Sequence, residues 1–263
     1  MPELPEVEST VRGLSRVNGA RIDKVEVLDS RLDFPVQEIV GKTIEGIERR
    51  GKYILFCLSS GGDLIFHLRM SGRLTLACSP AEEKHTRLIL HLGRVKVYFI
   101  NPRRLGTVEY SRNGFARNLG IDPLDREFTP RHLGEIAVAS RAQVKPLLMN
   151  QRRIAGLGNI YATEALWRSR IDPRRTGNTL TTKEVRLLHR AIVTVLREAI
   201  DHVGTTLGGA VSDYRNAFGN KGSFQNLLAV YSREGEPCPR CGEKIKRIAQ
   251  TGRSTYYCPE CQR

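Results

Sequence analysis

The first residues of the chain carry apolar side chains at helical spacing. Leu4, Val7, Val11, Leu14 and Val17 recur three and four residues apart. The neighbouring prolines are confined to the first turn, where a missing backbone N–H costs least. The pattern predicts an amphipathic helix at the start of the chain.

Beyond this helix the apolar period changes to two. The segments Ser59–Gly62 and Gly93-Arg94 have the composition of turns and separate successive apolar runs. Such spacing is typical of hairpins, so we expect an antiparallel sheet or sandwich. The expected strands contain Val25 and Val27 and then the runs 54–58, 64–68, 88–92 and 95–99.

The second half of the chain has helical periodicity. Residues 117–130 are rich in Gly, Pro and Asp, which indicates a linker between domains. Residues 141–170 predict two helices around a glycine-rich turn at 155–159, and a further helix begins near Thr182 and stops before Gly204. The predicted divisions are 1–116, the linker 117–130, a helical domain 131–228 that includes a glycine-bearing loop 208–222, and a terminal module 229–263.

Four of the six cysteines form two close pairs near the end of the chain. Cys238 and Cys241 are separated by two residues, as are Cys258 and Cys261, and sixteen residues lie between the pairs. This spacing predicts one structural zinc ion bound by four thiolates on a hairpin. Redox-active pairs are the alternative, but the surrounding sequence does not resemble a thioredoxin-type unit.

The charge balance favours a polyanionic partner. The chain has 42 Lys and Arg against 28 Asp and Glu, a net charge of +14, and neutralising phosphates releases condensed counterions. Lys244, Lys246, Arg247 and Arg253 lie between the cysteine pairs and suit phosphate contact; a solvated basic hairpin is the alternative.

The chain has no apolar run of membrane-spanning length, and its acidic start is unlike a secretion signal, so we expect a cytoplasmic or nucleoid location.

Four motifs in order carry a family resemblance over essentially the whole chain. They are Met-Pro-Glu-Leu-Pro-Glu-Val-Glu at 1–8, Gly-Leu-Gly-Asn-Ile-Tyr at 156–161, Gly-Ser-Phe-Gln at 222–225, and the segment 252–262 around the last cysteine pair. Together they resemble the bacterial formamidopyrimidine-DNA glycosylases. The resemblance implies an α+β multidomain fold: an N-terminal antiparallel β-sandwich with a leading helix, then a helix-two-turns-helix domain with a zinc-binding β-hairpin.

The same resemblance implies an enzyme of base excision repair. Such an enzyme acts as a monomer on double-stranded DNA. It excises oxidised purines such as 8-oxoguanine and formamidopyrimidines, and it nicks the abasic site by β,δ-elimination. The Schiff base of that reaction forms on Pro2.

The N-terminus has the chemistry that this reaction needs. Removal of Met1 exposes the ring nitrogen of Pro2 as a secondary amine, and a nucleophilic amine must be unprotonated. An α-amino group has a pKa of about 8 and a lysine about 10.4, so the terminus outranks Lys52 as the nucleophile. Glu3 adjoins Pro2 and is placed to donate and shuttle protons; helix capping is the alternative role for the glutamates near helix starts.

The resemblance assigns the remaining site residues. It gives catalytic roles to Pro2, Glu3, Lys52 and Arg253, and DNA contacts to His67, Met70, Arg103, Leu105, Lys145, Asn159 and Tyr161. It makes Glu6 and Glu164 pocket carboxylates, and it places Ser212, Asp213 and Tyr214 in a loop that closes over the lesion. Among the DNA contacts, Met70, Arg103 and Leu105 correspond to the residues that replace the extruded base.

This chain departs from the family pattern at three positions. Leu105 stands where phenylalanine is usual, Asn101 where aspartate is usual before Pro-Arg-Arg, and Asn150 where an acidic residue is usual before Gln151. None of the three removes a catalytic group.

Two other functions remain open. The first is a glycosylase of the endonuclease VIII type, which prefers oxidised pyrimidines; Leu4 and the length of the 208–222 loop argue against it. The second is a non-catalytic zinc-ribbon protein that binds DNA. Borohydride trapping of an imine separates an enzyme from a binder.

Overall fold

The computed structural model describes residues 1–77, 84–207 and 214–263. Within them the chain forms two compact units. Unit 1 consists of Met1–Arg117 and Ile200–Gln225, and unit 2 of Asn118–Ala199 and Asn226–Arg263.

Unit 1 begins with the predicted amphipathic helix. Helix α1 covers Leu4–Leu14 and continues into a short 3-10 turn, η1, at Ser15–Val17. The apolar residues that predicted the helix are all buried. The helix therefore forms because one face can be removed from water against the sheets of this unit.

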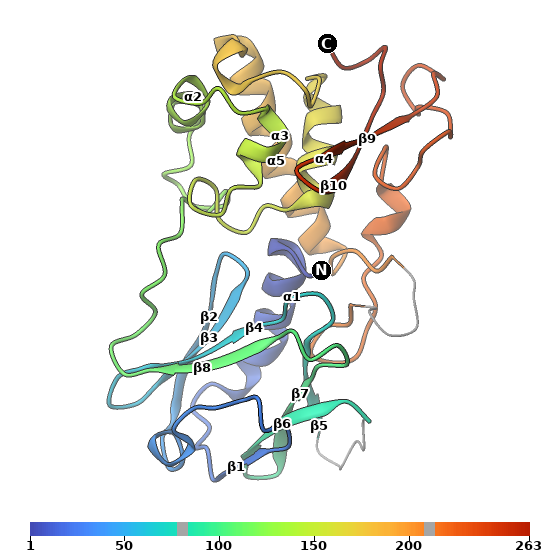
Figure 1. Ribbon diagram of the computed structural model, residues 1–263. Helices are drawn as coiled ribbons and strands as arrows, with labels where there is room; N and C mark the ends of the chain where they lie inside the picture. Colours follow the sequence, from blue (N-terminus) through green and yellow to red (C-terminus); the bar gives the residue numbers. More distant parts are fainter. Residues whose placement is uncertain (78–83, 208–213) are drawn as a thin grey trace. The chain divides into compact units, whose positions relative to one another are not determined.

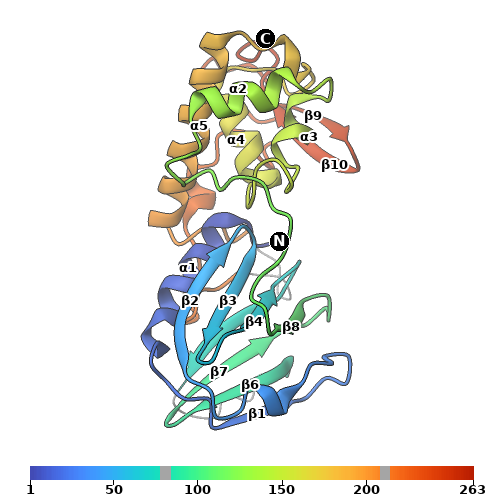
Figure 2. The same ribbon diagram turned by 90° about the vertical axis from the view of Figure 1, so that its left-hand side faces the viewer.

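Two four-stranded antiparallel sheets make up the rest of the unit 1 core (Figures 1 and 2). The first has the order β2-β3-β4-β8, with β2 at Ile44–Arg50, β3 at Tyr53–Leu58, β4 at Asp63–His67 and β8 at Thr107–Ser111. The second has the order β1-β6-β7-β5, with β1 at Lys24–Val27, β6 at Thr86–Leu92, β7 at Val95–Ile100 and β5 at Arg73–Ala77. A 3-10 turn, η2, lies at Val36–Glu38.

The apolar faces of the two sheets and of α1 share one core. Phe56 and Phe66 of the first sheet lie in the same buried cluster as Leu90 and Phe99 of the second, together with Leu14 of the helix. The predicted sandwich is confirmed. Strands β2, β5 and β8 were not among the expected strands.

Unit 2 is mainly helical. The predicted pair around the glycine turn is α3 at Val144–Leu148 and α4 at Asn159–Ser169, and the predicted long helix is α5 at Thr182–Asp201. Helix α2 at Pro130–Val138 starts where we expected the linker to end, with Thr129 as its N-cap. The unit also contains a 3-10 turn, η3, at Gly177–Thr179 and the hairpin of β9, Lys246–Gln250, and β10, Arg253–Tyr257 (Figure 2). Another 3-10 turn, η4, covers Phe224–Leu227.

No helix in the described ranges is long and apolar enough to span a membrane.

The segment predicted as a loop of the helical domain, 208–222, belongs with unit 1 where the structure describes it. The Tyr214 hydroxyl donates to the Glu6 carbonyl oxygen over 2.9 Å. A Cβ added at Gly13 of α1 would lie 2.7 Å from the Ala217 side chain, so the two backbones approach closely. These contacts join residues about 200 positions apart in the sequence. Apolar periodicity reports only on neighbouring residues, so it grouped the segment with the preceding helix.

A capping box starts α5, and it gives a prediction about acid stability. The Glu184 carboxylate accepts hydrogen bonds from the Thr181 N–H at 2.7 Å and the Thr181 hydroxyl at 2.8 Å, and the Glu184 N–H donates to Thr181 Oγ1 at 3.3 Å. The Arg175 guanidinium and the two Thr181 donors lower the pKa of Glu184 from 4.5 to about 2.

Folding lowers the pKa of Glu184, so its ionised carboxylate stabilises the folded protein. This contribution to the free energy of unfolding is complete above the unfolded pKa and is lost as the pH falls through about 2. We expect Glu184→Gln to lower the free energy of unfolding by about 1 to 2 kcal/mol at neutral pH. The difference from wild type should shrink below pH 4.5. Urea titrations of both proteins across that range measure it. A difference that does not depend on pH would show that the charge of Glu184 is not the stabilising element.

Candidate active site and zinc centre

The N-terminal residues of unit 1 are fixed at the start of α1. Pro2 and Glu3 are buried, whereas the Met1 side chain is exposed. Glu3 is the N-cap, and its N–H donates to Glu6 Oε2 over 2.8 Å in a capping box. The capping role that we weighed against catalysis is therefore present, and it also holds Glu3 directly beside Pro2.

Glu6 links the N-terminus to a distant part of the chain. Its second oxygen, Oε1, accepts the Thr205 N–H over 2.7 Å. Gly204 has a φ of +82°, and a Cβ there would lie 2.6 Å from Glu6 Oε1, so this close approach requires glycine. The Glu6 carboxylate thus joins the backbone of residue 3 to the backbone of residue 205.

Lys52 and His67 meet at one end of the β2-β3-β4-β8 sheet. Lys52 occupies the two-residue turn between β2 and β3 after Gly51, whose φ is +58°. His67 ends β4, where it is in register with Tyr53 of β3 and Thr107 of β8. Both side chains are largely buried. The hairpin turn and the strand end therefore place the two residues at the same end of the sheet.

His67 is a neutral hydrogen-bond donor. Burial, with Arg69 and Lys52 nearby, lowers its pKa from 6.5 to about 4, so it is uncharged at neutral pH. The Arg69 N–H donates to His67 Nδ1 over 3.1 Å. Because Nδ1 accepts, the ring proton is on Nε2, which can donate to a phosphate oxygen.

Met70, Arg103 and Leu105 lie on two hydrogen-bonded loops of unit 1. Met70 is in the turn between β4 and β5, and the other two are in the loop 101–106 between β7 and β8. The Arg103 N–H donates to Ser71 Oγ over 3.3 Å and joins the loops. Met70 is 40% exposed and Leu105 47%. Neither apolar side chain packs in the protein core, and exposed apolar side chains of this kind can insert into a stack of bases.

A second set of predicted residues surrounds the Ser254 carbonyl in unit 2. That oxygen accepts hydrogen bonds from Lys145 Nζ at 2.9 Å and from Asn159 Nδ2 at 3.2 Å. Lys145 also donates to Thr255 Oγ1 at 2.5 Å and is only 1% exposed. Its amine therefore binds the β9–β10 hairpin and is not free at the surface.

Arg253 is exposed at the first position of β10. It follows the two-residue turn Thr251-Gly252, in which φ is +47° and +73°; positive values at both central positions are those of a type I′ turn. The hairpin turn and the bonds to Ser254 together fix the backbone from which Arg253 projects.

Glu164 and Tyr161 are in the core of unit 2. The Glu164 carboxylate accepts backbone N–H groups of Ala229 at 2.9 Å, Val230 at 3.0 Å and Tyr231 at 2.8 Å. Burial raises the pKa of Glu164, and these three donors oppose the rise. Tyr161 is fully buried, so this structure does not expose its side chain to a phosphate.

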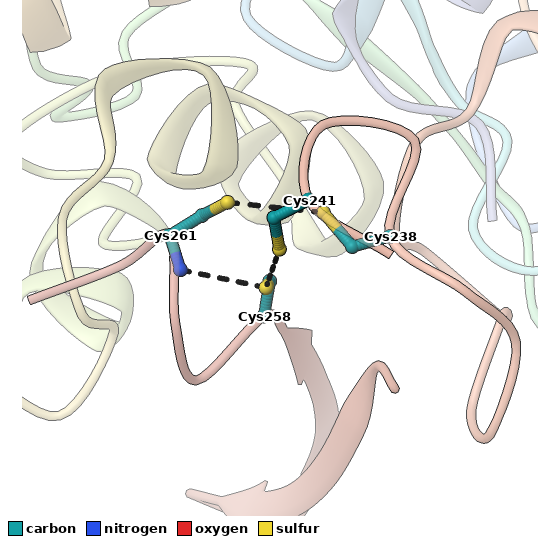
Figure 3. A group of neighbouring side chains, drawn as sticks. All are labelled: Cys238, Cys241, Cys258 and Cys261. Carbon is teal, nitrogen blue, oxygen red and sulfur yellow. Dashed lines mark hydrogen bonds between the residues drawn. The ribbon is translucent and has the colours of Figure 1, made fainter. Parts of the chain in front are cut away.

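The four predicted cysteine ligands come together in unit 2 (Figure 3). Their sulfur atoms all lie within 4.8 Å of one another. The Cys241 and Cys258 sulfurs are 3.4 Å apart and those of Cys238 and Cys261 3.9 Å. Zinc–sulfur bonds of about 2.3 Å in a tetrahedron put sulfurs about 3.8 Å apart, so the four residues fit one structural zinc ion.

Two aromatic residues support these groups, and neither was expected from the sequence. The Trp167 Nε1–H donates to Cys238 Sγ over 3.4 Å, and the Arg240 guanidinium lies 4.2 Å from the centre of the same ring. The Tyr231 hydroxyl lies 3.5 Å from Asn159 Nδ2. Trp167 belongs to no recognisable sequence motif, so its contact with Cys238 could be identified only from the folded structure.

The expected lesion loop is described only in part. Ser212 and Asp213 lie outside the described residues. Tyr214 is buried, and its hydroxyl bonds to the backbone of α1.

Family models match the chain in three consecutive segments. Residues 1–108 match the formamidopyrimidine-DNA glycosylase N-terminal domain, residues 119–209 the formamidopyrimidine-DNA glycosylase H2TH domain, and residues 235–263 the zinc finger found in FPG and IleRS.

Relatives and solved structures of the same name align along the whole chain. The formamidopyrimidine-DNA glycosylases of Roseiflexus sp. strain RS-1 and Lactiplantibacillus plantarum are 43% and 40% identical, each over 100% of both chains. The crystal structure of the MutM (Fpg) protein from Thermus thermophilus has a TM-score of 0.90 at 40% identity, covering 99% of this chain and 98% of that one. The wild-type Lactococcus lactis Fpg (MutM) in complex with an N7-benzyl-Fapy-dG-containing DNA has a TM-score of 0.89 at 35% identity, with 100% of both chains covered.

The sandwich, the helical unit and the four-cysteine hairpin thus occur in the order that these relatives share. The chain belongs to the formamidopyrimidine-DNA glycosylase family and is a DNA repair glycosylase with a zinc finger.

Proposed function

We propose that this glycosylase excises oxidised purines, 8-oxoguanine and formamidopyrimidines, from double-stranded DNA and then cleaves the abasic site as a lyase. The observation that carries the proposal is the buried Pro2-Glu3 pair, which the Glu6 carboxylate fixes at the start of α1. The structures of the related Lactococcus lactis protein with an N7-benzyl-Fapy-dG-containing DNA and with an abasic-site DNA support this substrate class.

In the proposed reaction the Pro2 nitrogen forms a covalent bond to the sugar of the damaged nucleotide. After Met1 is removed, the lone pair of the Pro2 nitrogen attacks C1′ of the damaged nucleoside, and the bond from C1′ to the base breaks. The Pro2 nitrogen loses its proton and the departing base gains one, Glu3 donates a proton to the ring oxygen of the sugar as the ring opens, and the nitrogen becomes part of an iminium. Loss of a proton from C2′ then expels the 3′ phosphate, and a second elimination expels the 5′ phosphate.

Side chains from both units bind the DNA in this proposal. Lys52 and neutral His67 contact phosphates near the damaged nucleotide, and Arg253 and Asn159 do the same from unit 2. Lys145 acts through the hairpin that it binds, by fixing the backbone next to Arg253.

Extrusion of the base leaves a space in the duplex that must be filled. Met70 and Leu105 fill it, and Arg103 bonds to the orphaned base. The loop 208–222, including Ser212, Asp213 and Tyr214, covers the everted base. Glu6 and Glu164 position backbone segments, and the protein acts as a monomer.

Borohydride trapping on four duplexes tests the proposal. The duplexes carry 8-oxoguanine, formamidopyrimidine, thymine glycol or a preformed abasic site. We expect a covalent protein–DNA adduct with the two purine lesions and with the abasic site, because reduction of the imine leaves a stable amine that links the protein to C1′ of the sugar. Trapping with thymine glycol in preference to the purine lesions would favour the endonuclease VIII type, and binding with no adduct on any duplex would favour a non-catalytic binder.

A further inference from the structure

The loop 101–106 of unit 1 is constrained at its base and exposed at its tip. Arg104 has a φ of +54°, a conformation that residues other than glycine rarely adopt. A Cβ at Gly106 would lie 2.8 Å from the Phe99 ring, so the loop returns tightly to the sheet. Arg103 and Leu105 flank the strained residue and are both exposed. Their directions therefore depend on what holds Arg104.

A buried aspartate holds it. Asp29, which lies just after β1, is 4% exposed. Arg104 Nε lies 3.1 Å from Asp29 Oδ2, and Arg87 Nε lies 3.9 Å from the same oxygen. Asp29 Oδ1 accepts the Arg31 N–H at 3.2 Å, with Arg31 Nε 3.5 Å away. Burial opposes the ionisation of Asp29, but the Arg31 N–H and the guanidinium groups, that of Arg104 first, hold its pKa below its usual range.

The cluster reaches the first residue of the loop as well. Arg87 Nε donates to the carbonyl oxygen of Asn101 over 3.2 Å. The side chain of Asn101 donates through Nδ2 to the Gly106 carbonyl at 3.3 Å and closes the loop on itself. In the described part of the chain Asn101 Oδ1 is buried without a hydrogen-bond partner. A neutral amide at 101 supplies no charge to the arginines, so the negative charge beside this loop comes from Asp29.

We propose that Asp29 is a positioning residue for opposite-base discrimination: through Arg104 it fixes the loop that presents Arg103 and Leu105 to the space left by the extruded base. The proposal rests on the function proposed above. Asp29 acts by holding Arg104 in the left-handed conformation that turns its two neighbours outward.

The test compares Asp29→Asn with wild type in single-turnover excision of 8-oxoguanine opposite each of the four bases. We expect excision opposite cytosine to slow about tenfold, the effect of losing the ion pair between Arg104 and the buried Asp29 carboxylate, with a smaller preference for cytosine over adenine. Strand cleavage at a preformed abasic site should change less than about threefold, because no base has to be extruded. Asp29→Glu keeps the charge and should restore part of the preference.

A spectroscopic measurement reports the loop directly. A duplex with a non-cleavable abasic analogue and 2-aminopurine as the opposite base should brighten when Arg103 and Leu105 enter the stack, and Asp29→Asn should reduce that change at saturating protein. Glu26→Gln is the matched control, because it removes one carboxylate from β1 that pairs with Lys24 at 2.7 Å and His91 at 2.9 Å, outside the cluster. It should match wild type.

Arg104→Ala removes the same ion pair from its other side and leaves Asp29 in place. If the ion pair positions the loop, Arg104→Ala and Asp29→Asn should have similar effects that do not add in the double variant. An unchanged opposite-base ranking and unchanged fluorescence in a folded Asp29→Asn protein, shown by its thermal melting, would overturn the proposal. Failure of wild type to excise 8-oxoguanine would contradict the proposed function alone, since the fluorescence measurement needs no catalysis.

Discussion

A protein that retains Met1 should bind damaged DNA but excise no base. In that protein the Pro2 nitrogen is an amide, whose lone pair is delocalised into the carbonyl, so it cannot attack C1′. We expect single-turnover excision of 8-oxoguanine and borohydride trapping to fall by at least about 10³-fold, as when a covalent nucleophile is removed. Affinity for a duplex with an abasic analogue should change less than about threefold, because charged phosphate contacts dominate binding.

The control is the same polypeptide after removal of Met1. Methionine aminopeptidase removes Met1, whose side chain is exposed, and mass spectrometry verifies the product. Activity should appear in proportion to the fraction of free Pro2. Pro2→Gly, with its N-terminus freed in the same way, tests the requirement for the secondary amine and should also lose excision and trapping. Full activity in a protein verified to retain Met1 would exclude Pro2 as the nucleophile.

The elements that could be predicted from sequence are those with long, regular apolar periods. Helix α5 buries a continuous apolar stripe over 20 residues, and α1 does so over three turns. Strand β2 lacks such a pattern because a bulge between Ile44 and Gly46 interrupts its pairing. Strands β5 and β8 each have only one buried apolar side chain, Leu74 and Val108, so neither contains an apolar run like those of β3 and β4.

The site residues divide along a similar line. The zinc ligands could be predicted because thiolate spacing is a local property, and the structure brings all four together. Motif matching could not predict burial. Lys145 and Glu164 are charged residues that lie in the core of unit 2, where they bind backbone groups of the zinc hairpin and of residues 229–231. Their partners are about 65 to 110 residues away in the sequence, and only folding determines such pairs.

The zinc hairpin should not fold without its metal. Among the residues that the structure describes, the buried cluster around it contains four, namely Val230, Cys238, Ile245 and Cys258, with Trp167, Tyr256 and Cys261 packed against them. Such a core is too small to offset the conformational entropy of the module, whereas a structural zinc contributes roughly 10 kcal/mol or more. Cys258→Ser should therefore abolish zinc binding and unfold the β9–β10 hairpin.

Loss of the hairpin should weaken DNA binding and spare the chemistry at Pro2. Lys145 and Asn159 both bind the Ser254 carbonyl, so the unfolded hairpin would no longer place Arg253. If Arg253 and one other basic residue of the hairpin each lose a phosphate contact of about 1.5 kcal/mol, affinity for an abasic-analogue duplex falls about 100-fold. Zinc stoichiometry, DNA titration and the fluorescence of Trp167, the one tryptophan of the chain, measure the three changes.

Cys57→Ser is the control variant, because it removes a thiol that is not a zinc ligand. It shows whether the effects of Cys258→Ser come from loss of the zinc site or from loss of any thiol. Cys57 lies in β3 of unit 1, apart from the four clustered cysteines, and burial raises its pKa to about 11, so it is an un-ionised thiol at neutral pH. This variant should keep its zinc, its Trp167 emission and its DNA affinity. At DNA concentrations high enough to saturate the weakened Cys258→Ser protein, borohydride should still trap an adduct through Pro2. Wild-type DNA affinity in zinc-free Cys258→Ser would show that the folded hairpin does not contribute to DNA binding.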